Sequence, residues 1–277
     1  LNASTIDLSF STLYIGNPAS EDNTISFKSE YYLTGDTRVF KIFAESDATR
    51  KNIGLGYLNF VAFKSLASKN VVKRNIAIGD EVFKSFVQGS YNVAIGYLTM
   101  RDATGGLYNI AIGRSALNKI TNNAEYNVGI SFGSLSNLTN GDYNIGIGRT
   151  AGSYLTTGSN NILIGERNGS NSSSSNSSLR LTTGSYNILI GNNIDCANAS
   201  SNIILLGNNV SQHGDNIMVI GGDSTNDIDA IHPGKDNNTD LGSSTYKFKD
   251  CYLNGDLTAA TITCTGFTVD ADGDTAV

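Results

Sequence analysis

Short runs of alternating apolar and polar residues recur along this chain at a nearly constant interval. In each run an Asn is followed by Ile or Val, by any residue, by Ile or Leu, and by Gly. Because successive side chains of a strand point to opposite faces, the pattern predicts a short strand with two large apolar residues on one face. Complete runs begin at Asn52, Asn75, Asn92, Asn109, Asn144, Asn161 and Asn187.

Three further runs deviate from the pattern. Asn127–Ser131 has lost the final Gly, while Asn202–Gly207 and Asn216–Gly221 carry one extra residue before it. Most intervals between successive Asn residues are 17 or 18 residues, and the two long ones are 23 and 26 residues. Self-similarity at such a short period is typical of solenoids. We therefore predict an all-β fold, a parallel β-roll or β-solenoid of about ten short rungs.

A second apolar pair lies eight and eleven residues after the repeat Asn. We expect this pair to form a second strand, and thus a second wall, because a 17-residue coil has room for two short strands and two turns. Glycines such as Gly89 and Gly106 follow the pair and suit tight corners. The pairs are Phe83 and Phe86, Met100 and Ala103, Leu117 and Ile120, and Leu135 and Leu138.

So thin a coil leaves part of its apolar stripe in water, which predicts association of several copies. We expect a parallel homotrimer that forms a fibre, with the stripes of the three chains packed around a common axis. In this arrangement one inward column of isoleucines should be buried. Its members are Ile78, Ile95, Ile112, Ile147 and Ile164.

Composition agrees with a fibre and excludes several classes of function. The 277 residues include 30 Gly, only 2 Pro and no Trp, which fits short strands joined by turns. The net charge of −6 disfavours nucleic acid as a partner. No apolar run approaches the roughly 20 residues of a membrane span, so we expect no membrane insertion. Cys196, Cys251 and Cys264 lack metal-ligand spacing, and we expect free thiols.

The chain divides into three parts. Residues 1–50 contain two alternating stretches, Ile6–Phe10 and Val39–Phe43, and form an N-terminal β module. Residues 51–222 are the solenoid, interrupted by a Ser- and Asn-rich insertion over residues 166–183. Residues 223–277 form a C-terminal β tail without the repeat.

Two stretches resemble known fibrous proteins. The repeated runs Tyr91–Gly96 and Tyr108–Gly113 resemble the head repeats of trimeric autotransporter adhesins and related repeats of phage tail fibres. The tail, in His232–Ser244 and Tyr246–Leu253, is similar to the segment that precedes the endosialidase-type intramolecular chaperone of many tail fibres. The resemblance covers residues 52–265 and implies a trimeric β-roll followed by a chaperone that is cleaved off or absent.

Several columns of residues could carry chemistry, and for each we prefer a structural interpretation. The tyrosines before the repeat Asn (Tyr91, Tyr108, Tyr126, Tyr143 and Tyr186) should form a stacked ladder with hydroxyls at its rim rather than a sugar platform. The repeat Asn residues should form an amide ladder. His213 and His232 have no partner at metal-ligand spacing, so we expect neither a metal nor a cofactor.

Carboxylates at the turns do not identify an enzyme. Asp80, Glu81, Asp102, Glu125 and Asp142 are expected to be solvated corners, because a glycosidase requires two carboxyl groups at a fixed separation. We therefore expect no catalysis.

We expect the receptor to be bound by the two long excursions, Gly56–Asn75 and the more exposed 166–183 loop, because loop sequence is free to vary while turn corners are not. Arg167, Asn168, Asn171, Asn176 and Arg180 offer donors to sugar hydroxyls or carboxylates. The favoured function is a receptor-binding phage tail fibre of the virion that attaches to host cell-surface glycan and contacts other virion or tail proteins at its N-terminal end. Alternatives are the head of a bacterial trimeric adhesin at the cell surface, or a polysaccharide-cleaving tailspike.

Overall fold

A computed structural model describes most of the predicted solenoid. It covers residues 52–56, 59, 72–121, 123–169, 180–212 and 214–222, together with the backbone of Phe40–Lys41. The strands are β1 (Phe40–Lys41), β2 (Ile53–Leu55), β3 (Val72–Lys73), β4 (Ile76–Ile78), β5 (Gly89–Ser90), β6 (Val93–Ile95), β7 (Ile110–Ile112), β8 (Val128–Ile130), β9 (Ile145–Ile147), β10 (Ile162–Ile164), β11 (Ile188–Ile190), β12 (Ile204–Leu206) and β13 (Met218–Ile220).

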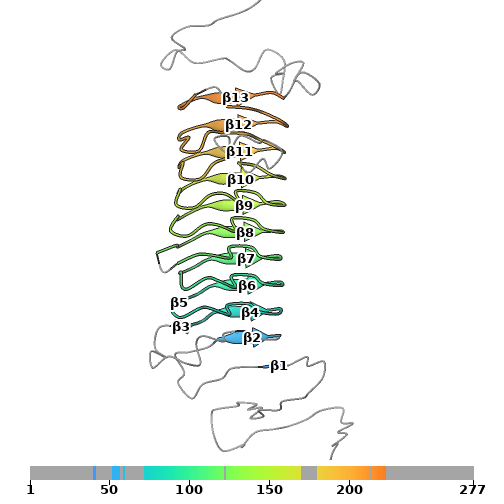
Figure 1. The fold of residues 1–277 in the computed structure, drawn as a ribbon, viewed down its shortest axis with the longest axis vertical. Coiled ribbons are helices and arrows are strands. Elements are labelled where there is room, and N and C mark those ends of the chain that lie inside the picture. Colours follow the sequence, from blue (N-terminus) through green and yellow to red (C-terminus); the bar gives the residue numbers. More distant parts are fainter. Residues whose placement is uncertain are drawn as a thin grey trace, which may run out of the picture. The chain divides into compact units, whose positions relative to one another are not determined.

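The strands from β2 onward, apart from β3 and β5, stack in chain order as one parallel sheet (Figure 1). Each strand pairs with the next coil in register, so that Val93 lies beside Ile110 and Ile110 beside Val128. β1 adds to β2 in the antiparallel direction, and β3 pairs with β5 in a separate small sheet. No helix occurs among the described residues. The predicted all-β parallel solenoid is confirmed, with ten parallel strands in its main sheet.

The two large apolar residues of each strand face away from the interior of their own coil. In β4 the middle residue Ala77 is fully buried, whereas Ile76 and Ile78 on either side are partly exposed. The same alternation holds in the other parallel strands up to β12. The isoleucines therefore lie on the outside of the coil in a single chain, and their burial between chains stays a prediction. The inward middle residue of the main-sheet strands is Gly or Ala from β2 to β9 and Leu in β10, β11 and β12.

Large and small residues alternate between the walls to fill this space. Gly146 sits opposite Leu135, and a Cβ added at Gly146 would lie only 2.7 Å from Leu135 Cγ. One coil later the sizes are exchanged: Leu163 is the inward strand residue, and it packs where Gly152 has no side chain, 2.5 Å from an added Cβ. Close packing thus couples the residue chosen on one wall to the residue on the other.

The opposite wall contains the predicted apolar pairs, but it is made of turns rather than a second strand. Phe83, Phe86, Met100, Leu117 and Leu135 are all fully buried. The first residue of each pair has a positive φ, 53° at Phe83 and 47° at Met100, which bends the chain out of the extended conformation. Backbone hydrogen bonds still join successive coils here, for example from Phe83 N to Thr99 O at 3.4 Å.

The predicted amide ladder runs through eight coils. Each Asn Nδ2 donates to the Oδ1 of the Asn in the preceding coil, over 2.9–3.1 Å, and each backbone N donates to the same oxygen. The second Nδ2 proton of the later members reaches a carbonyl of the following corner, such as Ala124 O from Asn109. The ladder consists of Asn52, Asn75, Asn92, Asn109, Asn127, Asn144, Asn161 and Asn187.

The sequences of the last two coils suggested one extra residue before the final Gly. The structure shows that there is none. Ile203, not Asn202, occupies the ladder position, because Ile203 N donates to Asn187 Oδ1 at 3.3 Å and β12 begins directly after it. Asn202 and Asn216 occupy the position of the tyrosines, with φ of 58° and 57°. Asn tolerates this left-handed conformation well, which explains its presence there.

Most strands of the main sheet end at a glycine. The backbone turns there with a large positive φ, which residues with a side chain rarely adopt. Gly148 has φ 128°, and an added Cβ would lie 2.3 Å from Gly165 O in the next coil. Ser131 takes this position in the coil whose motif has lost its Gly, and it is forced to φ 97°. This glycine position thus tolerates another residue in one coil, at a cost in strain.

The structure describes very little of the predicted N-terminal module and none of the predicted C-terminal tail. Within residues 1–50, the two-residue strand β1 lies inside the predicted stretch Val39–Phe43. Ile6–Phe10, the C-terminal tail over 223–277 and residues 170–179 of the insertion lie outside the described residues.

Candidate functional site

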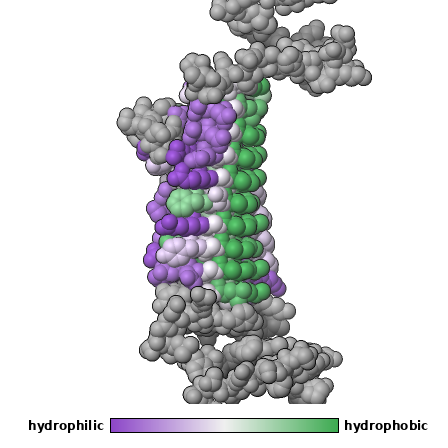
Figure 2. All heavy atoms as spheres, turned by 90° about the vertical axis from the view of Figure 1, so that its right-hand side faces the viewer, coloured by the Kyte–Doolittle hydropathy of each residue, from purple (hydrophilic) through white to green (hydrophobic). Residues whose placement is uncertain are grey.

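The outer face of the main sheet is a continuous apolar surface. It is formed by the first and third residues of each parallel strand, which lie in two columns along the stack (Figure 2). Exposed fractions of 37% at Ile112, 43% at Ile53 and 56% at Met218 show that the described residues leave much of this face uncovered. The predicted Ile column is therefore stacked in register but not buried within one chain.

The predicted tyrosine ladder is present over four coils. The rings of Tyr91, Tyr108, Tyr126 and Tyr143 stack nearly parallel with centroids 4.8–5.0 Å apart. Because the rings cover one another's faces, they leave mainly their edges and hydroxyl groups free, which suits a sugar platform poorly. Burial and the neighbouring tyrosines raise the pKa of Tyr126.

A third column follows the glycine that ends each strand. Arg114 lies over two aromatic rings in this column, with Cζ 5.8 Å from the centroid of Tyr97 and 5.5 Å from that of Phe132. Both rings are substantially exposed, at 50% and 42%. Arg149, one coil beyond Phe132, donates to Glu166 Oε1 at 2.8 Å. We did not single out this column from the sequence, although the position directly after each repeat Gly marks it.

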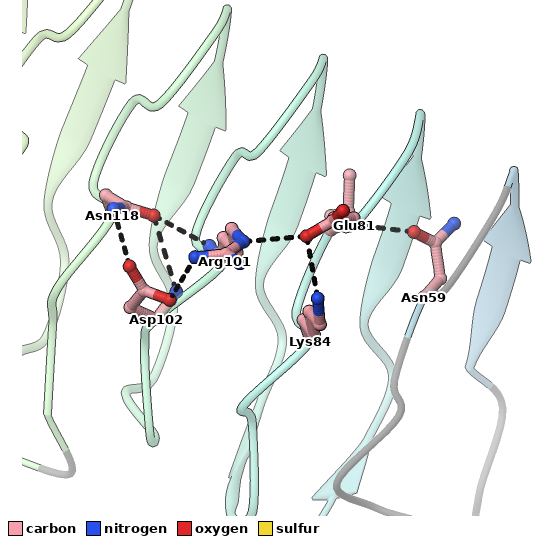
Figure 3. Close-up of polar contacts among 7 residues, drawn as sticks. Asn59, Glu81, Lys84, Arg101, Asp102 and Asn118 are labelled. Carbon is pink, nitrogen blue, oxygen red and sulfur yellow. Dashed lines mark hydrogen bonds and ion pairs between the residues drawn. The ribbon is translucent and has the colours of Figure 1, made fainter.

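Two of the predicted turn carboxylates, Glu81 and Asp102, are paired with cations rather than with each other (Figure 3). Glu81 Oε2 accepts from Arg101 Nε at 2.7 Å and from Lys84 Nζ at 2.9 Å. These bonds hold the pKa of Glu81 below its usual value. Asn118 completes the network, since its Nδ2 donates to Asp102 Oδ2 at 3.1 Å. Such a carboxylate stays ionised, and the network serves to join neighbouring coils.

The described residues of the predicted binding loop lie against the coil. Arg180 stacks over the ring of Tyr154 at 4.5 Å, and Arg167 Nε lies 3.6 Å from Glu166 Oε1. The two ends of the insertion meet, because Leu181 N donates to Gly169 O at 3.1 Å. Asn171 and Asn176 lie outside the described residues. The structure thus places Arg167 and Arg180 where the insertion leaves and re-enters the solenoid.

The prediction that all of residues 166–183 form a solvated loop is wrong at Asn168. Its side chain is fully buried and donates to the carbonyls of Ile164 and Leu189, the latter at 3.3 Å. It lies seven residues after Asn161, at the same place in its coil as the buried Thr99 and Ser134 have in theirs. A side chain in this inward column is not available to a ligand.

The described residues offer neither a metal site nor a reactive thiol. They contain no group of three or more His, Cys, Asp or Glu side chains arranged for a metal ion. His213 and His232 lie outside the described residues, as do Cys251 and Cys264. Cys196 is a free and fully buried thiol, and burial, aided by nearby Asp195, raises its pKa to about 12. It is therefore a core residue rather than a nucleophile.

In the described part of the chain no helix has the length and apolarity of a membrane span. No protein-family model, curated protein or solved structure matches this chain.

Proposed function

We propose that three copies of this chain form a parallel fibre that binds receptors on a host cell, as the tail fibre of a phage does. The apolar face that runs along all ten parallel strands carries this proposal (Figure 2). A soluble single chain rarely leaves so long an apolar surface in water, whereas a threefold arrangement buries it around an axis.

The energetic gain from covering this face is large. Two outward apolar residues on each of ten strands give 20 side chains per chain. If each half-exposed side chain gains about 1 kcal/mol on burial, association gains on the order of 20 kcal/mol per chain before its entropic cost. This gain is sufficient for a permanent trimer.

The fold also suits attachment at a distance. Coils that are joined by continuous ladders of hydrogen bonds make a stiff rod, and surface side chains repeat three times around it. Weak contacts to cell-surface glycan then act together, which raises avidity without a strong single site. The insertion over 166–183, with Arg167 and Arg180 at its base, is one place where such contacts would be made. Other virion proteins would hold the N-terminal end.

Two measurements test this function. Sedimentation equilibrium of the full chain should give about three times 29.3 kDa. Antibodies raised against the purified chain should label the tails of virus particles from the same source in electron micrographs. A folded monomer would contradict the assembly, and label on bacterial surfaces instead of particles would favour the adhesin.

A further inference from the structure

We propose that Arg114, held between Tyr97 and Phe132, binds carboxylate groups of an extended acidic polysaccharide, and that Arg149 binds the same chain two coils further along. This inference rests on the proposed attachment function only in taking a glycan as the ligand, and it names the class of that glycan.

The position of the Arg114 guanidinium prepares it to bind an anion. It lies over one ring on each side, at 5.8 Å and 5.5 Å from the centroids, and the side chain is exposed. A planar guanidinium stacked on rings keeps the N–H groups at its edge for two parallel bonds to a carboxylate. The rings also restrict its rotamers, so that less entropy is lost on binding.

Arg114 differs from Arg101, Arg149 and Arg167 because no carboxylate of the described residues pairs with it. Arg101 pairs with Glu81 and Asp102, and both Arg149 and Arg167 approach Glu166. A cation that is held in place by aromatic rings and left without a counterion is suited to an anion from outside the protein.

The spacing of the column favours a polysaccharide. Arg114 and Arg149 follow Gly113 and Gly148, which end strands separated by one coil. At about 4.8 Å per coil the two residues are roughly 10 Å apart along the stack. This distance is close to the length of two linked pyranose rings, so a chain with one carboxylate per disaccharide presents an anion to each arginine. The exposed edge of Phe132, which lies between the two arginines, contacts the sugar rings between the anions, and Tyr97 contacts the sugar on the other side of Arg114.

The same column disfavours nucleic acid. A phosphate backbone carries a charge on every nucleotide and requires dense cations, whereas here two arginines stand among Asp80 and Glu166 on a chain with net charge −6. Sparse cations interleaved with aromatic rings match a sparsely charged glycan. Polar and less polar groups alternate beside the apolar band in Figure 2.

Binding of the assembled protein to immobilised polysaccharides tests the proposal. The probes are hyaluronate, polygalacturonate and polysialic acid, with dextran as the neutral control and polyglutamate as an acidic peptide. The parent protein should bind at least one acidic polysaccharide and not dextran, and binding should weaken from about 50 to about 300 mM NaCl. Arg114→Gln should weaken it roughly tenfold or more, and Arg149→Gln less, since Arg149 is shared with Glu166.

Matched variants separate the site from general effects of charge. Arg74→Gln removes an exposed arginine that lies over only one ring, that of Tyr91 at 5.2 Å, and should bind like the parent. Phe132→Leu keeps the bulk and removes one ring, and should weaken binding. Each variant should sediment as the parent does, because these side chains are exposed.

Three outcomes would overturn the proposal: no acidic polysaccharide binds, Arg114→Gln binds as well as the parent, or polyglutamate binds as tightly as the best polysaccharide. Failure of the attachment function is distinguishable. If antibodies label no virus particle while polysaccharide binding still requires Arg114, the binding site is supported and the viral role is rejected.

Discussion

Each ladder asparagine connects three coils through one short side chain. Asn109 donates to Asn92 Oδ1 and Ala124 O, and its own Oδ1 accepts from the backbone and side chain of Asn127. With all its polar atoms paired inside the protein, such a residue can be buried at little cost. Removing it orphans groups in the coils on both sides, so the ladder couples neighbouring coils.

Asn109→Ala should destabilise the protein by about 4 kcal/mol per chain, because several buried donors and acceptors lose their partners and each costs about 1–3 kcal/mol. Denaturant titration followed by circular dichroism measures the effect. Asn118→Ala is the control, since Asn118 is only partly buried and bonds at a corner. Equal stability of the two variants would contradict the importance of the ladder.

Cys196 should resist alkylation in the folded protein at about pH 8, since burial holds its pKa near 12 and keeps the thiol protonated. A raised pKa stabilises the fold below the unfolded pKa of about 9, and this contribution is lost as the pH rises further. Iodoacetamide labelling of a Cys251→Ser, Cys264→Ser variant, followed by mass spectrometry with and without denaturant, checks this. Fast labelling of the native protein would refute it.

At the scale of elements, the sequence predicted the strands, their parallel stacking and the amide ladder. The assignment of residues to the amide ladder was wrong where the same residue type suits two neighbouring positions of the coil. Asn202 was taken as a ladder residue because Asn also suits the left-handed position before the ladder, whereas counting four residues back from Gly207 finds Ile203. The alternation at Ile76 and Ile78 predicted that they share one face, but it did not show which face lies inside the coil, and burial of the Ile column between chains stays a prediction. The small residue Ala77 was the informative signal.

The binding surface was less predictable than the fold. Arg167 and Arg180 are at the base of the insertion, but Asn168 is buried, because the insertion begins later than its composition suggested. The Arg114 column was missed, since residues 17 or 18 apart become neighbours only once the coil is known.

Ser131→Gly should stabilise the protein by about 1 kcal/mol, since glycine adopts φ 97° without the strain that a side chain causes. The gain appears as a higher denaturant midpoint. Gly148→Ser, the reciprocal change in the next coil, should be destabilising, because its Cβ would clash with Gly165 O. A loss of stability in Ser131→Gly would show that the serine has a role of its own.

Deleting residues 171–179 should leave the solenoid folded. The interval of 26 residues between Asn161 and Asn187 then falls to 17, the same as in neighbouring coils, and two residues remain between Gly169 and Leu181. Sedimentation and thermal melting should match the parent. If the insertion contacts the receptor, binding to host cells should fall. Unfolding of the deletion variant would mean that the insertion supports the coil.

At the scale of the whole molecule, the surface has two parts. The apolar face of the sheet requires a partner to cover it, whereas the polar columns do not. Column residues such as Tyr97 and Arg114 carry polar or charged groups that water can solvate. The isoleucines of the sheet carry none. Assembly and recognition can therefore be separated by mutation.

Ile112→Asp should prevent assembly while leaving a single chain able to form its coils, because Ile112 is 37% exposed in one chain. In a trimer the three carboxylates would be buried near one another, at several kcal/mol per charge. Sedimentation should show monomers or aggregates. Lys119→Asp, at an exposed corner, should still assemble. An Ile112→Asp protein that assembles and melts like the parent would exclude this face as the interface.

The order of the hydrogen bonds has a mechanical consequence. Those described between coils join each coil to the next one along the chain, as Asn75 is joined to Asn52 and to Asn92. A pulling force at the ends is therefore carried through the coils in series, and the stack yields by peeling from an end. Each coil that is released frees 17 residues, which extend by roughly 55 Å. A rod built in this way lengthens in discrete steps under load and can absorb the shock of a moving surface without breaking elsewhere.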